Sequence, residues 1–133
     1  MLILLPPSEG KSSPSGKSRL DLDSLAFADH LGEKRASLVA ALEKLGAASE
    51  KKAIEALGIS KGQAGDIARD AELATSPVAP ASDVYTGVLY DRLDFPSLPA
   101  TGKRRAGRSL LISSALWGLL APGDRIPYYR FSM

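Results

Sequence analysis

The sequence contains no cysteine. Without a thiol, the chain can form neither a disulfide framework nor a thiolate metal site, and it has no cysteine nucleophile. Long apolar runs are also missing. The opening apolar segment, residues 1–5, stops at two prolines and is too short for a signal-peptide core, and no stretch approaches the roughly 20 residues that span a bilayer. We therefore expect a soluble, cytoplasmic protein without a membrane partner.

Histidine is almost absent as well. The single His30 stands beside Asp29, and no Ser/His/Asp arrangement or metal-ligand cluster can be assembled around it. The nearby carboxylates Asp21, Asp23 and Asp29 lie next to loops, where capping explains them more simply than a metal does. The sequence thus predicts no catalytic residue, no metal site and no cofactor.

The composition is that of a globular protein, with 44% hydrophobic and 24% charged residues, and the length predicts a single domain over residues 1–133. Apolar periodicity, caps and breakers predict the elements. We expect a buried strand at 1–5, helices at 33–45, 50–57 and 62–73, a turn capped by Asp83 with a short helix to 90, a strand at 109–113, and a short helix at 115–120 with Trp117 in the core. Because strands and helices alternate, the fold class is α/β or α+β, a mixed sheet with flanking helices.

Basic residues concentrate toward the end of the chain, although the net charge is only +2. Residues 101–133 hold six basic residues and one acidic residue, Asp124. The densest cluster consists of Lys103, Arg104, Arg105 and Arg108. Such a cluster favours an anionic partner, and binding to nucleic acid through it would weaken steeply with salt. A solvated basic loop before the strand explains the same residues.

A glycine-containing turn is expected between the second and third helices. Residues 57–67 are similar to the helix-hairpin-helix motif, with matches at Gly58, Ile59, Ala64 and Ile67 and with Ser60 in place of the second glycine. A tight hairpin brings backbone N–H groups and a lysine close to one DNA phosphate. The residues that would touch the phosphate backbone of double-stranded DNA are Gly58, Ser60, Lys61 and Gln63. A plain packing unit of two helices explains the string equally well.

The triplet Gly10-Lys11-Ser12 looks like the end of a phosphate-binding loop, but it lacks that chemistry. Leu5 occupies the position of the first glycine, and Pro6 and Pro7 have no N–H group to offer a phosphate. We therefore predict no ATPase.

Four segments together carry a family resemblance: residues 1–11, 83–89 (Asp-Val-Tyr-Thr-Gly-Val-Leu), 116–122 (Leu-Trp-Gly-Leu-Leu-Ala-Pro) and 127–130 (Pro-Tyr-Tyr-Arg). In this order they resemble the YaaA family, bacterial proteins linked to the peroxide stress response. The resemblance implies a cytoplasmic DNA-binding protein with a helix-hairpin-helix unit, associated with limiting free iron and oxidative damage. It covers only the first half of the family's length. We therefore expect an incomplete family fold with an exposed sheet edge or apolar face, and a tendency to self-associate.

The same resemblance singles out residues on loops and element ends, where functional groups concentrate. These are Lys11, Asp83, Tyr85, Thr86, Tyr128 and Arg130. If they converge in a pocket, the alternative function is an enzyme of unknown reaction on an anionic small molecule or nucleotide. A structural Asp83–Arg130 ion pair with core tyrosines is the simpler explanation of these residues. A helical interaction module, the third alternative, needs neither basic cluster.

Overall fold

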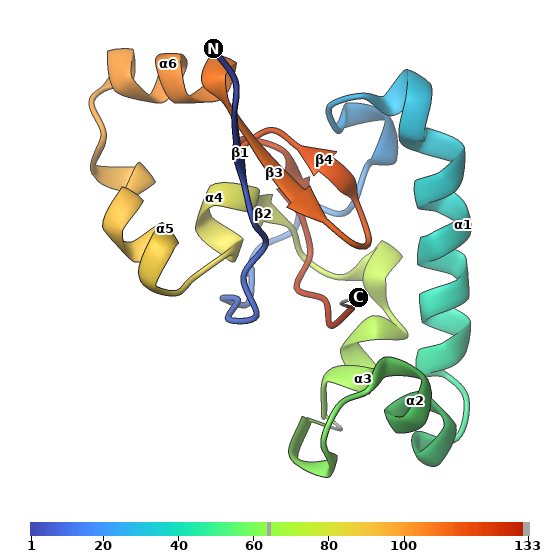
Figure 1. Cartoon of the computed structure of the whole chain (residues 1–133). Helices are drawn as coiled ribbons and strands as arrows, with labels where there is room; N and C mark the ends of the chain where they lie inside the picture. The colour runs from blue at the N-terminus through green and yellow to red at the C-terminus, as the bar shows by residue number, and fades with distance from the viewer. Residues whose placement is uncertain (64, 132–133) are drawn as a thin grey trace.

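The computed structural model describes residues 1–63 and 65–131 and contains a small mixed sheet (Figure 1). Its strand order is β1 (Ile3–Leu5), β3 (Leu110–Ser114) and β4 (Gly118–Leu120). β1 runs parallel to β3, whereas β4 pairs with β3 in an antiparallel hairpin. A second, two-stranded antiparallel sheet joins β2 (Ala79–Pro80) to β5 (Arg125–Ile126). The predicted mixed sheet with flanking helices is confirmed.

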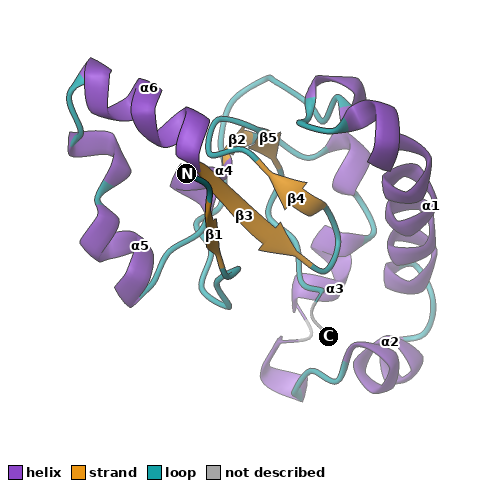
Figure 2. Cartoon of the chain, turned by 45° about the horizontal axis from the view of Figure 1, so that its top comes forward, coloured by secondary structure: helices purple, strands orange, loops and turns teal. Residues whose placement is uncertain are grey.

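Helices lie on two sides of this sheet (Figures 1 and 2). α1 (Ala28–Gly46) runs along one side, with α2 (Glu50–Leu57) and α3 (Gly65–Asp70) at its end. α5 (Val88–Leu93) and α6 (Ala100–Ser109) lie on the other side, and the short α4 (Ala81–Val84) is behind the sheet in Figure 1. The 3-10 turns are η1 (Leu22–Ser24), η2 (Lys61–Gln63), η3 (Leu73–Thr75) and η4 (Phe95–Ser97). None of the helices in these two described ranges is both long and apolar enough to cross a bilayer.

Elements with strong local signals form where they are predicted. α2 spans the predicted residues, and the Ser49 side chain accepts the Lys52 N–H at its start. α1 ends at Gly46 as expected, but it begins at Ala28, five residues before the predicted start, after Phe27 in a left-handed conformation. The predicted strand at 109–113 is β3, shifted by one residue. Asp21 accepts the Asp23 N–H at the start of η1, so its predicted capping role is confirmed.

The first strand forms, but the prediction that it is buried is wrong. β1 is the edge strand of its sheet, and Leu2 and Leu4 are 69% and 60% exposed. Only Leu5 packs against the core cluster. A short apolar run cannot by itself distinguish a central strand from an edge strand. The exposed sheet edge expected for an incomplete family fold is therefore present.

The predicted helix at 115–120 is also wrong, because this segment turns and returns as β4. Gly118 has φ +74°, a left-handed conformation that glycine adopts without strain, and the Ser114 hydroxyl accepts the Trp117 N–H in the turn. The hairpin then sets Leu120 opposite Ile112. The predicted core position of Trp117 is confirmed, because this residue is fully buried.

Three further segments differ from prediction. The expected helix at 62–73 is divided among η2, α3 and η3. Asp83 lies inside α4 rather than capping a later helix, and Gly87, with φ +112°, separates α4 from α5. The basic segment expected as a loop belongs to α6. α6 buries none of its residues, so its helix reflects the local helix propensity of its lysine, arginine and alanine residues.

A buried arginine connects α1 to the β3–β4 hairpin. Arg35 is only 1% exposed, and its Nε and Nη2 donate to the carbonyl oxygens of Trp117 and Leu119 at 2.9 and 2.8 Å. Its Nη1 has no hydrogen-bond partner within the described residues, and burial lowers the pKa of Arg35 while Asp124 opposes this effect. The guanidinium ties the helix to the hairpin through these two backbone acceptors.

Replacing this arginine tests the connection. We expect Arg35→Ala to lower the free energy of unfolding by about 3 kcal/mol, because it leaves two carbonyl groups without their donor and opens a gap beside Trp117. Urea unfolding followed by tryptophan fluorescence measures the change. Lys34→Ala, on the exposed side of the same helix, is the matched control and should shift stability by less than about 0.5 kcal/mol. Equal effects of the two substitutions would contradict this role.

Candidate functional site

Segments from the beginning and middle of the chain lie side by side at the candidate site. The Ser12 N–H donates to the Val84 carbonyl at 2.7 Å, and the Thr86 N–H donates to the Gly10 carbonyl at 3.0 Å. Lys11 and Tyr85 form an antiparallel bridge between these two bonds. A Cβ atom at Gly10 would lie 2.8 Å from Thr86 Oγ1, so a larger residue there would force the Thr86 side chain to move.

The end of the described chain joins the other two segments through buried hydroxyl groups. Tyr129 Oη lies 2.6 Å from Tyr85 Oη and 2.9 Å from Ser114 Oγ. Tyr129 also contacts the ring of Trp117 edge-on, at 5.9 Å between centroids. Burial raises the pKa of both tyrosines, so both phenols are neutral.

Lys11 lies above these rings. Its Nζ is 4.7 Å from the Tyr129 ring centroid and 5.9 Å from that of Tyr85, within the range of cation–π attraction. Burial and the positive charge of Arg130 lower the pKa of Lys11, while the nearby carboxylates oppose this effect. No carboxylate of residues 1–63 or 65–131 lies within ion-pair distance of it. Lys11 is thus a half-buried amine with donors available to a ligand.

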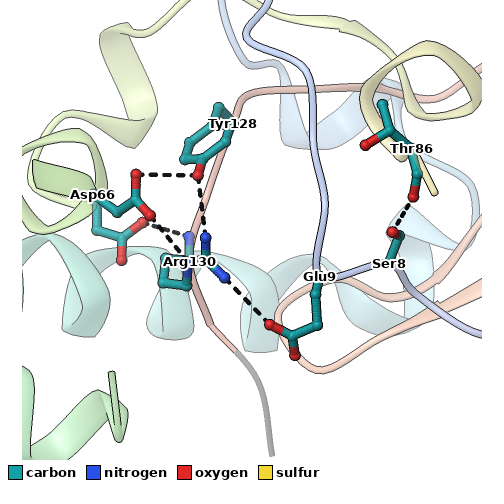
Figure 3. A network of polar contacts seen from close by, with 7 residues as sticks. Ser8, Glu9, Asp66, Thr86, Tyr128 and Arg130 are labelled. Carbon is teal, nitrogen blue, oxygen red and sulfur yellow. Dashed lines mark hydrogen bonds and ion pairs between the residues drawn. The ribbon is translucent and has the colours of Figure 1, made fainter. Parts of the chain in front are cut away.

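Arg130 is held by a network of polar contacts (Figure 3). Its Nε donates to Asp66 Oδ2 at 3.1 Å and its Nη1 to Glu9 Oε2 at 3.2 Å. The Tyr128 hydroxyl donates to Asp66 Oδ1 at 3.0 Å and accepts from Arg130 Nη2 at 3.4 Å. Burial opposes the charge, but the hydrogen bond to Asp66 and the contact with Tyr128 outweigh it, so the pKa of Arg130 is raised.

Asp70 anchors the same segment from α3. It is fully buried, and its Oδ1 accepts the backbone N–H of Arg130 at 2.8 Å. Its Oδ2 has no partner within the described part of the chain. Burial raises the pKa of Asp70 to about 7, and the hydrogen bond from Arg130 only partly opposes this rise. Strongly shifted carboxyl groups of this kind are concentrated at functional sites.

A hollow of about 330 Å³ lies at the carboxyl end of β3, next to these groups. Lys11, Arg130 and Glu9 supply its charges, and the hydroxyl groups of Ser8, Ser113 and Ser114 supply neutral donors and acceptors. Tyr129 and Phe131 give it an apolar wall. The size and lining suit a small molecule with an anionic group and an apolar part.

The structure brings some of the predicted pocket residues together and places others elsewhere. Lys11 and Arg130 line the hollow, and Tyr85 lies behind Tyr129. Thr86 uses its carbonyl oxygen to accept from Ser8. Tyr128 faces α3, where the Arg69 guanidinium lies 4.3 Å from its ring centroid.

The predicted structural pair of Asp83 and Arg130 does not form. Asp83 is exposed, and Arg130 pairs with Glu9 and Asp66 instead. The segment 8–12 separates α4 from Arg130, because Ser12 bonds to the carbonyl groups of Val84 and Asp83. Asp83 therefore has no part in the hollow.

Several residues of the site are absent from the sequence prediction: Glu9, Asp66, Asp70, Ser114 and Tyr129. Asp66 and Asp70 are four positions apart on α3, so they share one face of that helix. This spacing is the one local signal that could have identified them. Their partners on residues 128–130 are separated from them by about half the chain. Within the described ranges, no group of histidine, aspartate and glutamate side chains could hold a metal ion.

The two predicted nucleic-acid surfaces lie at opposite ends of the molecule (Figures 1 and 2). On α6, a shallow hollow of about 360 Å³ is lined by Arg104, Arg105 and Arg108, and Lys103 is exposed on the same helix. At the other end, Gly58 closes α2 with φ +63°, Ser60 and Lys61 are exposed, and Gln63 ends η2. Ala64 of the proposed motif lies outside the described residues. The hairpin's match to a DNA-binding motif stays a prediction.

Asp70 makes stability depend on pH. Its carboxyl pKa is near 4 when unfolded and about 7 in the folded protein, so the folded state holds more protons between these values. The free energy of unfolding should therefore fall as pH rises from about 4 to about 7, and then level off. Asp70→Asn keeps an oxygen acceptor for Arg130 without the charge, so it should flatten this dependence and stabilise the protein at pH 8 by about 2 kcal/mol.

Urea unfolding across this pH range measures the effect. Asp83→Asn, which removes an exposed carboxylate, is the control and should leave the pH dependence unchanged. An Asp70→Asn variant with the original pH dependence would show that Asp70 is not the group responsible.

Comparison with known proteins assigns the chain to a family. Residues 1–133 match the family described as "Peroxide stress protein YaaA". The chain is 49% identical over 133 residues to UPF0246 protein SCO2297 of Streptomyces coelicolor, covering 100% of this chain and 51% of that protein. It is 41% identical over 132 residues to UPF0246 protein CE1889 of Corynebacterium efficiens, covering 99% of this chain and 51% of that protein.

A more distant relative is the uncharacterized protein Cj0984 of Campylobacter jejuni, 29% identical over 131 residues, with 98% of this chain and 53% of that protein covered. The chain thus spans about half the length of the curated relatives it matches. By the match over its whole length, this chain belongs to the YaaA family of peroxide stress proteins.

Proposed function

We propose that this chain is part of a peroxide stress protein that binds double-stranded DNA through its backbone phosphates, with α6 as the main contact surface. The family supplies the stress role. The observation that carries the DNA contact is the charge of α6: it contains four basic residues and no acidic one. Its arginines form no ion pair with any described carboxylate, so they are available to phosphates.

The geometry of α6 suits phosphates rather than base edges. Arg104 and Arg108 are one helical turn apart and share a hollow with Arg105, which places three guanidinium groups on one exposed face. Guanidinium groups bind phosphate oxygens through two parallel hydrogen bonds. Contacts of this kind position a protein on a duplex without reading its sequence.

The hairpin after α2 is proposed as a second, weaker contact with its backbone and Lys61. Because it lies at the far end of the molecule from α6, it would not reach the same few phosphates (Figure 1). From the family alone we also infer that the stress role includes limiting free iron and oxidative damage. Within residues 1–63 and 65–131 no cluster of metal-binding side chains is present, so direct iron binding by these residues is not part of the proposal.

The DNA proposal is tested by changing α6 alone. Arg104→Ala/Arg105→Ala/Arg108→Ala should weaken duplex binding equally for unrelated sequences and should reduce the slope of log K against log salt by about 2 to 3. Fluorescence anisotropy with a labelled duplex between about 50 and 200 mM salt measures both quantities. Adding Lys61→Glu should weaken binding further.

The matched control is Lys34→Ala/Lys44→Ala, which removes exposed charges from α1 instead. It should leave the salt slope within about one unit of the original. Absence of duplex binding at low salt, both for this chain and for a family-length relative, would contradict the proposal. An equal loss in both sets of variants would mean that net charge, rather than α6, drives binding.

The second candidate function is binding of, or catalysis on, an anionic small molecule or nucleotide in the 330 Å³ hollow. The convergence of Lys11, Tyr129 and Arg130 around one concavity favours it. Arg130 is already neutralised by Glu9 and Asp66, so Lys11 is the group with donors to spare. A phosphate or carboxylate bound there would raise the lowered pKa of Lys11 and contact the serine hydroxyl groups.

Thermal-shift screening with nucleotides and anionic metabolites tests this pocket. We expect a ligand that raises Tm for the original chain and has no effect on Lys11→Met, which keeps the apolar stem and removes the ammonium group. Lys17→Met, in the same loop but exposed, should retain the full shift. If no compound in the screen raises Tm, or if Lys11→Met responds like the original chain, the pocket does not bind anions through Lys11.

A further inference from the structure

We propose that the outer face of the three-stranded sheet is a docking surface for a second polypeptide segment, equivalent to the half that the longer relatives carry beyond the region matched here. We call this surface the outer leucine face. It consists of Leu2, Leu4, Leu111 and Leu119.

The register of the strands places these four leucines on one face. Leu4 pairs with Leu111, and Leu119 pairs with Ser113, two residues along β3 from Leu111. Paired residues and residues two apart point to the same side of a sheet. The alternate residues Leu5, Ile112 and Leu120 point to the other side, where they join the core cluster.

The outer leucine face is uncovered in this chain. Leu2 and Leu4 are 69% and 60% exposed, and Leu111 and Leu119 are half-buried. In Figure 1 no helix lies in front of β1, β3 and β4, while α4 and β2 lie behind them. β1 also presents a free edge, since β3 is its only partner in the described sheet. A free edge beside exposed leucines is the arrangement that another chain segment completes.

The length of the relatives indicates what covers this face. The chain aligns with 51% of the Streptomyces coelicolor and Corynebacterium efficiens proteins, so each has nearly as much polypeptide again outside the match. A domain built from packed layers needs a covering layer on each apolar sheet face. The described residues supply that layer on the core side only.

The candidate pocket connects this surface to function. Ser113 lies on the same side of the sheet as Leu111 and also lines the 330 Å³ hollow. A segment docked on the outer leucine face would therefore border the open side of the hollow. It could supply further groups to a bound ligand without changing the contacts of Lys11 and Arg130.

Cysteine accessibility tests the proposal directly, because the chain has no thiol of its own. Leu4→Cys is placed in the 133-residue chain and in a chimera in which the remaining half of the Streptomyces coelicolor protein follows residue 133. The rate of maleimide labelling is measured in both. We expect labelling to be about tenfold slower in the chimera, since reaction follows thiol exposure.

Leu38→Cys is the matched control, an exposed leucine on α1 at 37%. Its labelling rate should be the same in both proteins. Equal labelling of Leu4→Cys in chain and chimera overturns the proposal, and so does equal slowing at both positions. Labelling of Leu4→Cys that slows with concentration in the 133-residue chain would identify a second copy as the occupant and also overturn it.

If the chimera does not melt cooperatively, a second measurement is made. The two halves are then co-expressed as separate chains, with an affinity tag on one. Co-purification that Leu4→Glu abolishes and Leu38→Glu preserves supports the proposal. Failure of the unaltered halves to co-purify, or equal behaviour of the two variants, overturns it.

Discussion

The hydrogen bond between the hydroxyl groups of Tyr85 and Tyr129 joins the segments that form the candidate site. Tyr85 is bridged to Lys11 through the backbone, and Tyr129 contacts Ser114 at the end of β3. Both phenols are buried, and Tyr85 depends on this bond for its hydroxyl group, whereas Tyr129 also bonds to Ser114. This pairing therefore fixes the distance between the three segments, and the positions of Lys11 and Arg130 around the hollow follow from it.

The two cations of the site, Arg130 and Lys11, have different partners. Arg130 is held between Glu9 and Asp66, so it serves mainly to position the end of the described chain. Lys11 has aromatic rings beneath it and no ion-pair partner in the described ranges, which leaves its ammonium group available. The arginines of α6 are also unpaired among these residues, but they are exposed and screened by salt. A half-buried amine suits one compact ligand, and a row of exposed guanidinium groups suits an extended polyanion.

Sequence reasoning succeeded where the controlling interactions are local. The Ser49 cap and the following apolar spacing define α2, and the apolar run before Ser114 defines β3. It failed at residues 115–120, since a spacing compatible with a helix is overridden by the left-handed Gly118 and by pairing with β3. The resemblance singles out Lys11 and Arg130, which line the same hollow, but Asp66 and Asp70 gain their contacts only with residues some 60 positions away. No periodicity encodes such contacts.

The distant partners of Arg35 and β1 also have a consequence for the order of events during synthesis. A ribosome releases the chain from its N-terminus, so β1 and α1 emerge long before the β3–β4 hairpin that completes their contacts. Until residues 110–120 appear, Arg35 stays hydrated and the apolar side of α1 has no sheet to cover. High sequence separation of this kind slows folding and prolongs the exposure of apolar segments to chaperones. Residues 110–120 must therefore be synthesised before these contacts of β1 and Arg35 can form.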